Sequence, residues 1–112
     1  MLLFAAALSN AQDYTWAEHI APIVYKKCAS CHRNDGIAPF SMTSYEDAKN
    51  VAIAIKSAIE SKHMPPWPPD PSYNRLAHER ILTDEEKTAI FEWIAMGTAS
   101  GNLSQVPPLP DF

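Results

Sequence analysis

Two cysteines stand three residues apart and are followed at once by a histidine, in the stretch Cys28-Ala29-Ser30-Cys31-His32. Thiols at this spacing can add across the two vinyl groups on one edge of a porphyrin. The histidine that follows can then place its imidazole beneath the ring, on the iron. A C-x-x-C-H pattern is typical of covalent haem attachment. We therefore predict one haem c, with thioether bonds to Cys28 and Cys31 and with His32 as the proximal iron ligand.

Two other uses of a C-x-x-C pair are less well supported by the rest of the chain. A thioredoxin-like dithiol is expected within a βαβ pattern, and the sequence shows no such pattern. A zinc site needs further ligands at suitable spacing, but the chain has only two cysteines and hence no second pair.

A haem iron held by one protein ligand needs a sixth, which methionine or histidine could supply. Met64 is distinguished by its place in the stretch His63-Met64-Pro65-Pro66-Trp67. The two prolines restrict the backbone and would hold the thioether in position at a small entropic cost. We expect Met64 to be the distal iron ligand. The full set of candidates is Met42, Met64, Met96, His19, His63 and His78.

Two other interpretations of this stretch stay open. Met64 could be core filler, as methionine often is. His63 is the rival ligand, although as the last residue of a predicted helix it could instead cap helix carbonyls.

Further groups could support a haem. A backbone carbonyl in the loop after the motif could accept the Nδ1–H of His32, and Pro39 is the candidate for that carbonyl, unless the loop is an ordinary turn. Trp67, Arg75 and Arg80 could donate hydrogen bonds to the haem propionates, although each could equally belong to a solvated loop.

The composition indicates one small globular domain. The chain has 112 residues, of which 46% are apolar, and a net charge of −4. This charge gives no sign of nucleic-acid binding. If both cysteines form thioethers, none remains for a disulfide. A covalent haem would give such a short chain a large apolar body to fold around.

The N-terminus has features of an export signal. Residues 1–11 contain an apolar run over 2–8 and then small residues, as before a cleavage site, although no lysine or arginine precedes the run. We interpret 1–11 as a signal peptide with a truncated or weak start; a frayed apolar terminus is the alternative. The run is too short to span a bilayer. We expect a periplasmic or secreted protein with a domain over 12–98 and a Pro-rich extension over 99–112.

The spacing of apolar residues predicts an all-α fold of three main helices separated by Pro-rich loops. Pairs with the spacing of an N-cap precede them: Thr15 with Glu18, Ser44 with Asp47, and Thr83 with Glu86. Pro22 would kink the first helix, so its regular part could begin near Ile20. Gly97 could end the last helix, and the chain after it is expected to be extended on the surface or disordered. The predicted ranges are 16–27, 45–62 and 84–96.

The motif, the methionine in a Pro-rich loop and the helices at both ends resemble a class I monohaem cytochrome c. More narrowly, the C-x-x-C-H and Met64-Pro65-Pro66-Trp67 motifs resemble a bacterial cytochrome c module that also occurs with larger redox enzymes. The resemblance implies a small cytochrome c-like fold around a covalent haem c. It also implies that Cys28 and Cys31 form the thioethers, that His32 and Met64 bind the iron, and that the first and last helices pack across each other.

These features together predict electron transfer rather than enzymatic catalysis, although peroxidase-like activity stays open. We expect a monomer that meets redox partner proteins transiently and does not span a membrane. Lys26 and Lys27 could form a basic rim for such a partner, or simply a solvated helix face. Two alternatives remain: a haem subunit docked to a larger oxidoreductase, and a five-coordinate haem sensor or peroxidase.

Overall fold

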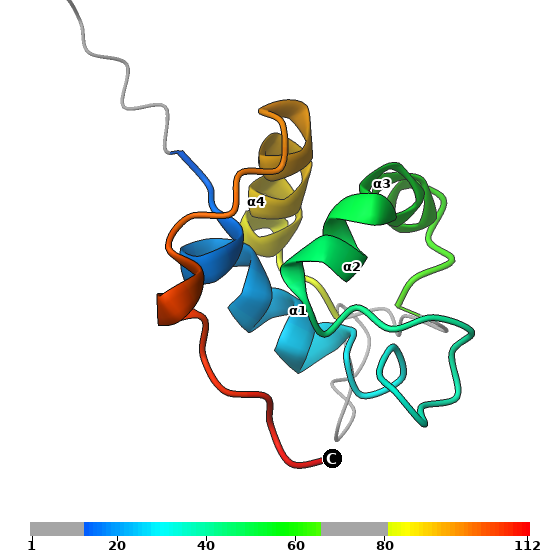
Figure 1. The fold of residues 1–112 in the computed structure, drawn as a ribbon. Helices are drawn as coiled ribbons and strands as arrows, with labels where there is room; N and C mark the ends of the chain where they lie inside the picture. The colour runs from blue at the N-terminus through cyan, green and yellow to red at the C-terminus, as the bar shows by residue number, and fades with distance from the viewer. Residues whose placement is uncertain (1–12, 66–80) are drawn as a thin grey trace, which may run out of the picture.

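A computed structural model describes residues 13–65 and 81–112 of the chain. These residues form helices joined by loops, and no strand occurs within them, so the all-α prediction is confirmed for this part of the chain. Figure 1 shows their arrangement. In chain order the elements are the π-helix η1 (Trp16–Ile20), α1 (Ala21–Lys27), α2 (Tyr45–Asn50), α3 (Ala52–Glu60), α4 (Asp84–Ala95) and the 3₁₀ helix η2 (Leu103–Gln105).

The first helical segment begins directly after Thr15, as the capping pattern predicts, and changes from a π-helix to an α-helix before Pro22. The Thr15 hydroxyl accepts a hydrogen bond from the Glu18 amide, which satisfies one donor at the helix start. The π-helix η1 ends at Ile20, and the regular helix α1 starts at Ala21 with Pro22 in its first turn. Proline is tolerated in the first turn of an α-helix, where its fixed φ suits the helix. The expected start near Ile20 is confirmed.

The second predicted helix, 45–62, is wrong as a single element. The Ser44 hydroxyl caps α2 as expected, but the chain leaves helical geometry at Val51, with φ −113° and ψ 16°, before α3 begins. The apolar spacing continues across this break, with Ala48 and Ala52 both buried. One non-helical residue hardly alters such spacing, so the hydrophobic pattern could not reveal the break.

The last main helix, α4, has both halves of a capping box. The Thr83 hydroxyl accepts from the Glu86 amide, and the Glu86 carboxylate accepts from the Thr83 amide. Gly97, with φ +99°, follows the end of the helix and turns the chain. The range 84–96 was therefore predicted to within one residue.

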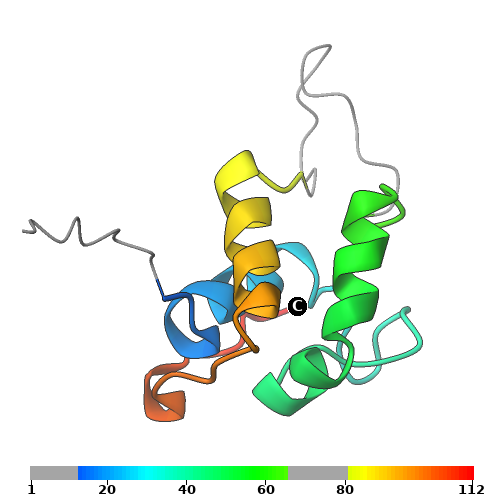
Figure 2. The same cartoon turned by 90° about the horizontal axis from the view of Figure 1, so that it is seen from above.

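The first and last helical segments meet in the core through two tryptophans. Trp16 in η1 and Trp93 in α4 are almost fully buried, and their ring centroids lie 6.1 Å apart. α4 also contacts α3, and Figure 2 shows these two helices side by side. This packing agrees with the arrangement that the resemblance implies for the first and last helices.

The chain after α4 returns to η1 rather than leaving the fold. The Ala99 carbonyl accepts hydrogen bonds from the Trp16 amide and the Trp93 indole, each at 2.9 Å. Further along, the Arg33 guanidinium lies 4.7 Å from the centroid of the Phe112 ring. The C-terminal segment thus lies on the surface, one of its two expected arrangements.

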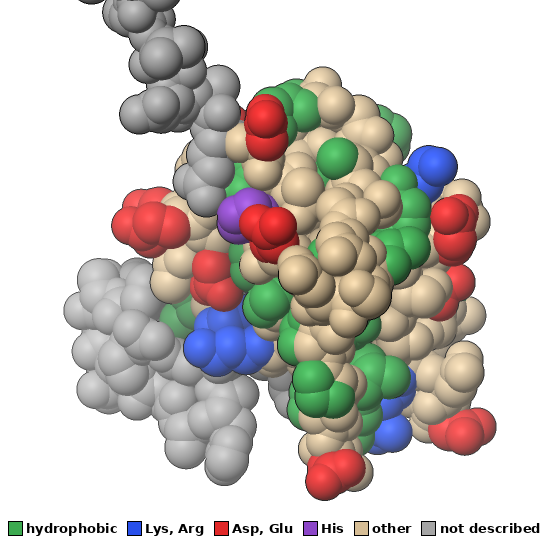
Figure 3. Space-filling model, turned by 60° about the vertical axis from the view of Figure 1, so that its left-hand side comes forward, with side chains coloured by type: hydrophobic (Ala, Val, Ile, Leu, Met, Phe, Trp, Pro, Cys, Tyr) green, Lys and Arg blue, Asp and Glu red, His purple; other side chains and the backbone are tan. Residues whose placement is uncertain are grey.

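On the face drawn in Figure 3, acidic side chains are scattered rather than gathered into one patch. Among the helices of the described residues, none is long and apolar enough to cross a membrane. The predicted signal peptide, 1–11, lies outside the described residues.

Candidate functional site

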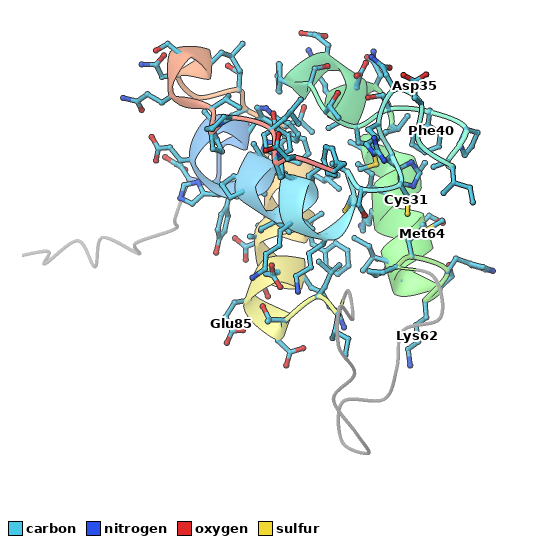
Figure 4. The ribbon with its side chains drawn as sticks, turned by 90° about the horizontal axis from the view of Figure 1, so that it is seen from below. Cys31, Asp35, Phe40, Lys62, Met64 and Glu85 are labelled. Carbon is cyan, nitrogen blue, oxygen red and sulfur yellow. The ribbon has the colours of Figure 1, made fainter. Side chains whose placement is uncertain are left out.

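One cavity brings together the cysteines and the histidine of the motif with Met64. It has a volume of about 440 Å³, within the range of small-molecule and cofactor sites. Cys31, Phe40 and Met64 can be followed in Figure 4, which views the molecule from below. The lining residues are mostly apolar: Lys27, Cys28, Cys31, His32, Ile37, Ala38, Pro39, Phe40, Met42, Ala54, Ile55, Ala58, Ile59, His63, Met64, Pro65 and Leu82.

The end of α1 positions the motif. The Cys28 amide donates to the Val24 carbonyl at 2.8 Å, so Cys28 closes the last turn of the helix. The Cys28 carbonyl then accepts from the amides of Cys31 and His32, at 3.2 and 3.0 Å. This tight turn brings both thiols and the imidazole to the same cavity. The side chains of Cys28, Cys31 and His32 therefore all line this cavity.

The Cys28 thiol lies in apolar surroundings. Burial, followed by the nearby Glu86 carboxylate, raises the pKa of Cys28 from 9.0 to about 12. The thiol is therefore neutral at physiological pH. Both cysteines are free of a disulfide, so each sulfur is available for another covalent bond.

His32 is buried and held by the carbonyl of Phe40, which lies 3.1 Å from Nδ1. The prediction that Pro39 supplies this carbonyl is wrong by one residue. The Met42 amide donates to the His32 carbonyl at 2.8 Å, and this bond turns the loop so that the Phe40 carbonyl faces the ring. Pro39 still lines the cavity. Because a carbonyl can only accept, Nδ1 carries a proton, and Nε2 is the ring nitrogen that could bind a metal.

The structure narrows the candidates for a sixth ligand. Met64 and His63 line the cavity from the end of α3, whereas His19 and Met96 are not among its lining residues. Met42 also lines the cavity, but from the loop that holds His32. His78 lies outside the described residues. Met64 and His63 are thus the candidates that reach the cavity from a different element than His32.

Lys27 has a role that its sequence context did not reveal. Its Nζ donates to the Ile81 carbonyl at 2.7 Å and lies 3.9 Å from Oε1 of Glu86, and its side chain is only 13% exposed. Lys27 is therefore not part of a solvated basic rim, whereas Lys26 is exposed. The partners of Lys27 lie far along the chain, so only the Thr83–Glu86 capping pattern pointed to any of this network in advance.

The remaining predicted contacts, Trp67, Arg75 and Arg80, lie outside the described residues. Within 13–65 and 81–112, no three His, Cys, Asp or Glu side chains gather into a site that could hold a metal ion. No protein-family model matches the chain, and no match is found among curated proteins or solved structures.

Proposed function

We propose that this chain is an exported electron-transfer protein with one covalently bound haem c. The observation that carries the proposal is one apolar cavity that is lined by Cys28, Cys31, His32 and Met64 together. Two thiols, one imidazole with a free Nε2 and one thioether are the donor set that a six-coordinate haem c requires. The apolar walls suit a porphyrin ring.

Different residues of the chain would bind the vinyl groups and the iron of the haem. Cys28 and Cys31 would each form a carbon–sulfur bond with one vinyl group, the thiol proton passing to the vinyl carbon. His32 would bind iron through Nε2, with its ring fixed by the Phe40 carbonyl. Met64 would bind the iron through its thioether sulfur. A haem bound in this way supplies an iron that gains and loses one electron without needing a substrate.

The ligand pair has a chemical consequence. A thioether opposite a histidine raises the reduction potential of haem iron relative to two histidines. Apolar side chains such as Ile55, Ile59 and Leu82 line the cavity, and this lining would pack against a bound haem. The proposed protein is therefore a carrier whose iron is closed to substrates.

The test is expression of the full chain together with haem-maturation machinery. We expect haem to stay on the chain in a denaturing gel, and the ferric protein to show the far-red absorption band of methionine-bound iron. Cys28→Ser with Cys31→Ser is the control that should lose the covalent haem. A wild-type chain without covalent haem would refute the proposal, whereas rapid carbon monoxide binding to the reduced wild type would indicate a five-coordinate sensor or peroxidase.

One observation favours a second candidate, a haem subunit docked to a larger oxidoreductase. Ile37, Phe40 and Met64 line the cavity, yet they are 90%, 42% and 41% exposed. Exposed apolar side chains gathered at one site are typical of an interface. Sedimentation of the protein in extracts of its source cells separates the two, because a free carrier sediments as a single small chain.

A further inference from the structure

A histidine stands beside the proposed methionine ligand on the wall of the cavity. His63 and Met64 are adjacent in the chain, and both line the same cavity as Cys28, Cys31 and His32. Neighbouring side chains often point to different surroundings, so the presence of both at one cavity needs a structural cause.

The end of α3 supplies that cause. The helix ends at Glu60, and Lys62 adopts a left-handed φ of 63° that reverses the chain. The amides of His63 and Met64 then both donate to the Ala58 carbonyl, at 3.0 and 3.2 Å. One carbonyl therefore anchors the backbone of both residues at the end of the helix.

The Ser61 hydroxyl contacts one nitrogen of the His63 ring. Its oxygen lies 2.7 Å from Nδ1 of His63 and 3.3 Å from the Ala58 carbonyl oxygen. Because Nδ1 faces the hydroxyl, Nε2 is the ring nitrogen through which His63 could bind a metal. A hydrogen bond of this kind on the far nitrogen is what orients histidine ligands in metal sites.

We propose that His63 is an alternative sixth ligand, which binds the iron through Nε2 when Met64 is not bound. The inference rests on the proposed function, since it concerns the same haem. Neutral imidazole is a good ligand for iron, and His63 is already oriented at the cavity. The iron would then be six-coordinate in two states, one with Met64 bound and one with His63 bound. The histidine state would have the lower reduction potential because it lacks the thioether.

The proposal is tested on haem-bound protein at neutral pH, by the spin state of the ferric iron and by carbon monoxide binding to the ferrous iron. We expect Met64→Ala to remain low-spin and to bind carbon monoxide slowly. Met64→Ala with His63→Ala should become high-spin and bind it rapidly. Ser61→Ala in the Met64→Ala background should increase the high-spin fraction, and Ser61→Thr, which keeps the hydroxyl, should not.

The matched control is His19→Gln in the Met64→Ala background, because His19 is not among the lining residues. It should leave the low-spin spectrum unchanged. Three results would overturn the proposal: a Met64→Ala protein that is already high-spin, a low-spin Met64→Ala protein that is indifferent to His63→Ala, or a wild type whose spectrum is identical to that of Met64→Ala. Absence of covalent haem from the wild type is a different result, which refutes the proposed function itself.

Discussion

Lys27 and Glu86 form an ion pair beside the cavity, with 3.9 Å between Nζ and Oε1. Both side chains are largely buried, at 13% and 18% exposure. Each has a second partner: Lys27 donates to the Ile81 carbonyl at 2.7 Å, and Glu86 accepts from the Thr83 amide at 2.9 Å. The network joins the last residue of α1, directly before the motif, to the start of α4. It therefore fixes one wall of the site from two distant parts of the chain.

Lys27→Met should weaken this wall and alter the electrostatics of the site. The substitution keeps much of the apolar stem but removes the donor to Ile81, which we expect to destabilise the fold by about 1–3 kcal/mol. It also removes a positive charge at the cavity while Glu86 stays negative. The remaining charge favours oxidised iron, so the reduction potential should fall. Denaturant unfolding and voltammetry of the haem-bound protein measure the two effects.

Lys26→Met is the control, since the neighbouring lysine is exposed. It should change stability by less than about 0.5 kcal/mol and leave the potential close to that of the wild type. Lys27→Met combined with Glu86→Gln should recover most of the lost potential, because the pair is then removed as a neutral unit. Equal shifts for the two lysine variants would show that the ion pair has no local effect.

Local chemistry explains which parts of the fold could be predicted. The starts of α2 and α4 depend on a hydroxyl and an amide three residues apart, as Ser44 and Thr83 show. The break at Val51 hardly changes the apolar spacing, so the hydrophobic pattern did not predict it. The end of α4 at Gly97 was predictable because glycine adopts a positive φ at little cost.

In the site, too, the features that depend on neighbouring residues could be predicted, and those that depend on distant residues could not. Cys28, Cys31 and His32 were recognisable because their spacing is local, and Met64 because prolines follow it. The acceptor for His32 was assigned to Pro39 instead of Phe40, since the rotation of the loop depends on the Met42 amide. Lys27 was misjudged because its acceptor, the Ile81 carbonyl, is 54 residues away along the chain.

Gly36→Ala should disrupt the loop after the motif. A Cβ at this position would overlap the Cys31 carbonyl oxygen and approach the Arg33 carbonyl to 3.0 Å. The Cys31 carbonyl also accepts from the Ala38 amide, so the loop has little room to shift. We expect a loss of about 1–3 kcal/mol and a lower yield of covalent haem, measured by denaturant unfolding and by the haem-to-protein ratio.

Gly97→Ala provides the comparison for that experiment. A Cβ on Gly97 meets nothing within 4 Å, but its φ of +99° disfavours a side chain, at a cost of about 1–2 kcal/mol. This glycine follows α4 and does not line the cavity. Haem yield should therefore be preserved despite a similar loss of stability. An equal drop in yield for both variants would mean that stability alone, and not the loop geometry, governs attachment.

Trp93→Phe should destabilise the contact between the two ends of the chain. The substitution removes the indole donor to the Ala99 carbonyl and part of the surface packed on Trp16. Ala99 keeps its bond from the Trp16 amide, so we expect a moderate loss of about 1–3 kcal/mol. Phe91→Leu, at a partly buried position of the same helix, should cost less than about 1.5 kcal/mol. A smaller loss for Trp93→Phe than for Phe91→Leu, measured by thermal unfolding, would contradict this account of the core.

Removal of the haem should lower stability, because the cavity of about 440 Å³ would then be left with apolar walls and no apolar occupant. The same wild-type chain made with and without haem-maturation machinery gives a matched pair. The haem-free form should melt at least about 5 °C lower, which is the shift that 1 kcal/mol produces in a domain of this size. Cys28→Ser with Cys31→Ser should behave like the haem-free wild type. Equal melting temperatures would show that the cavity walls are stable without an occupant. The apolar lining would then not indicate a porphyrin site.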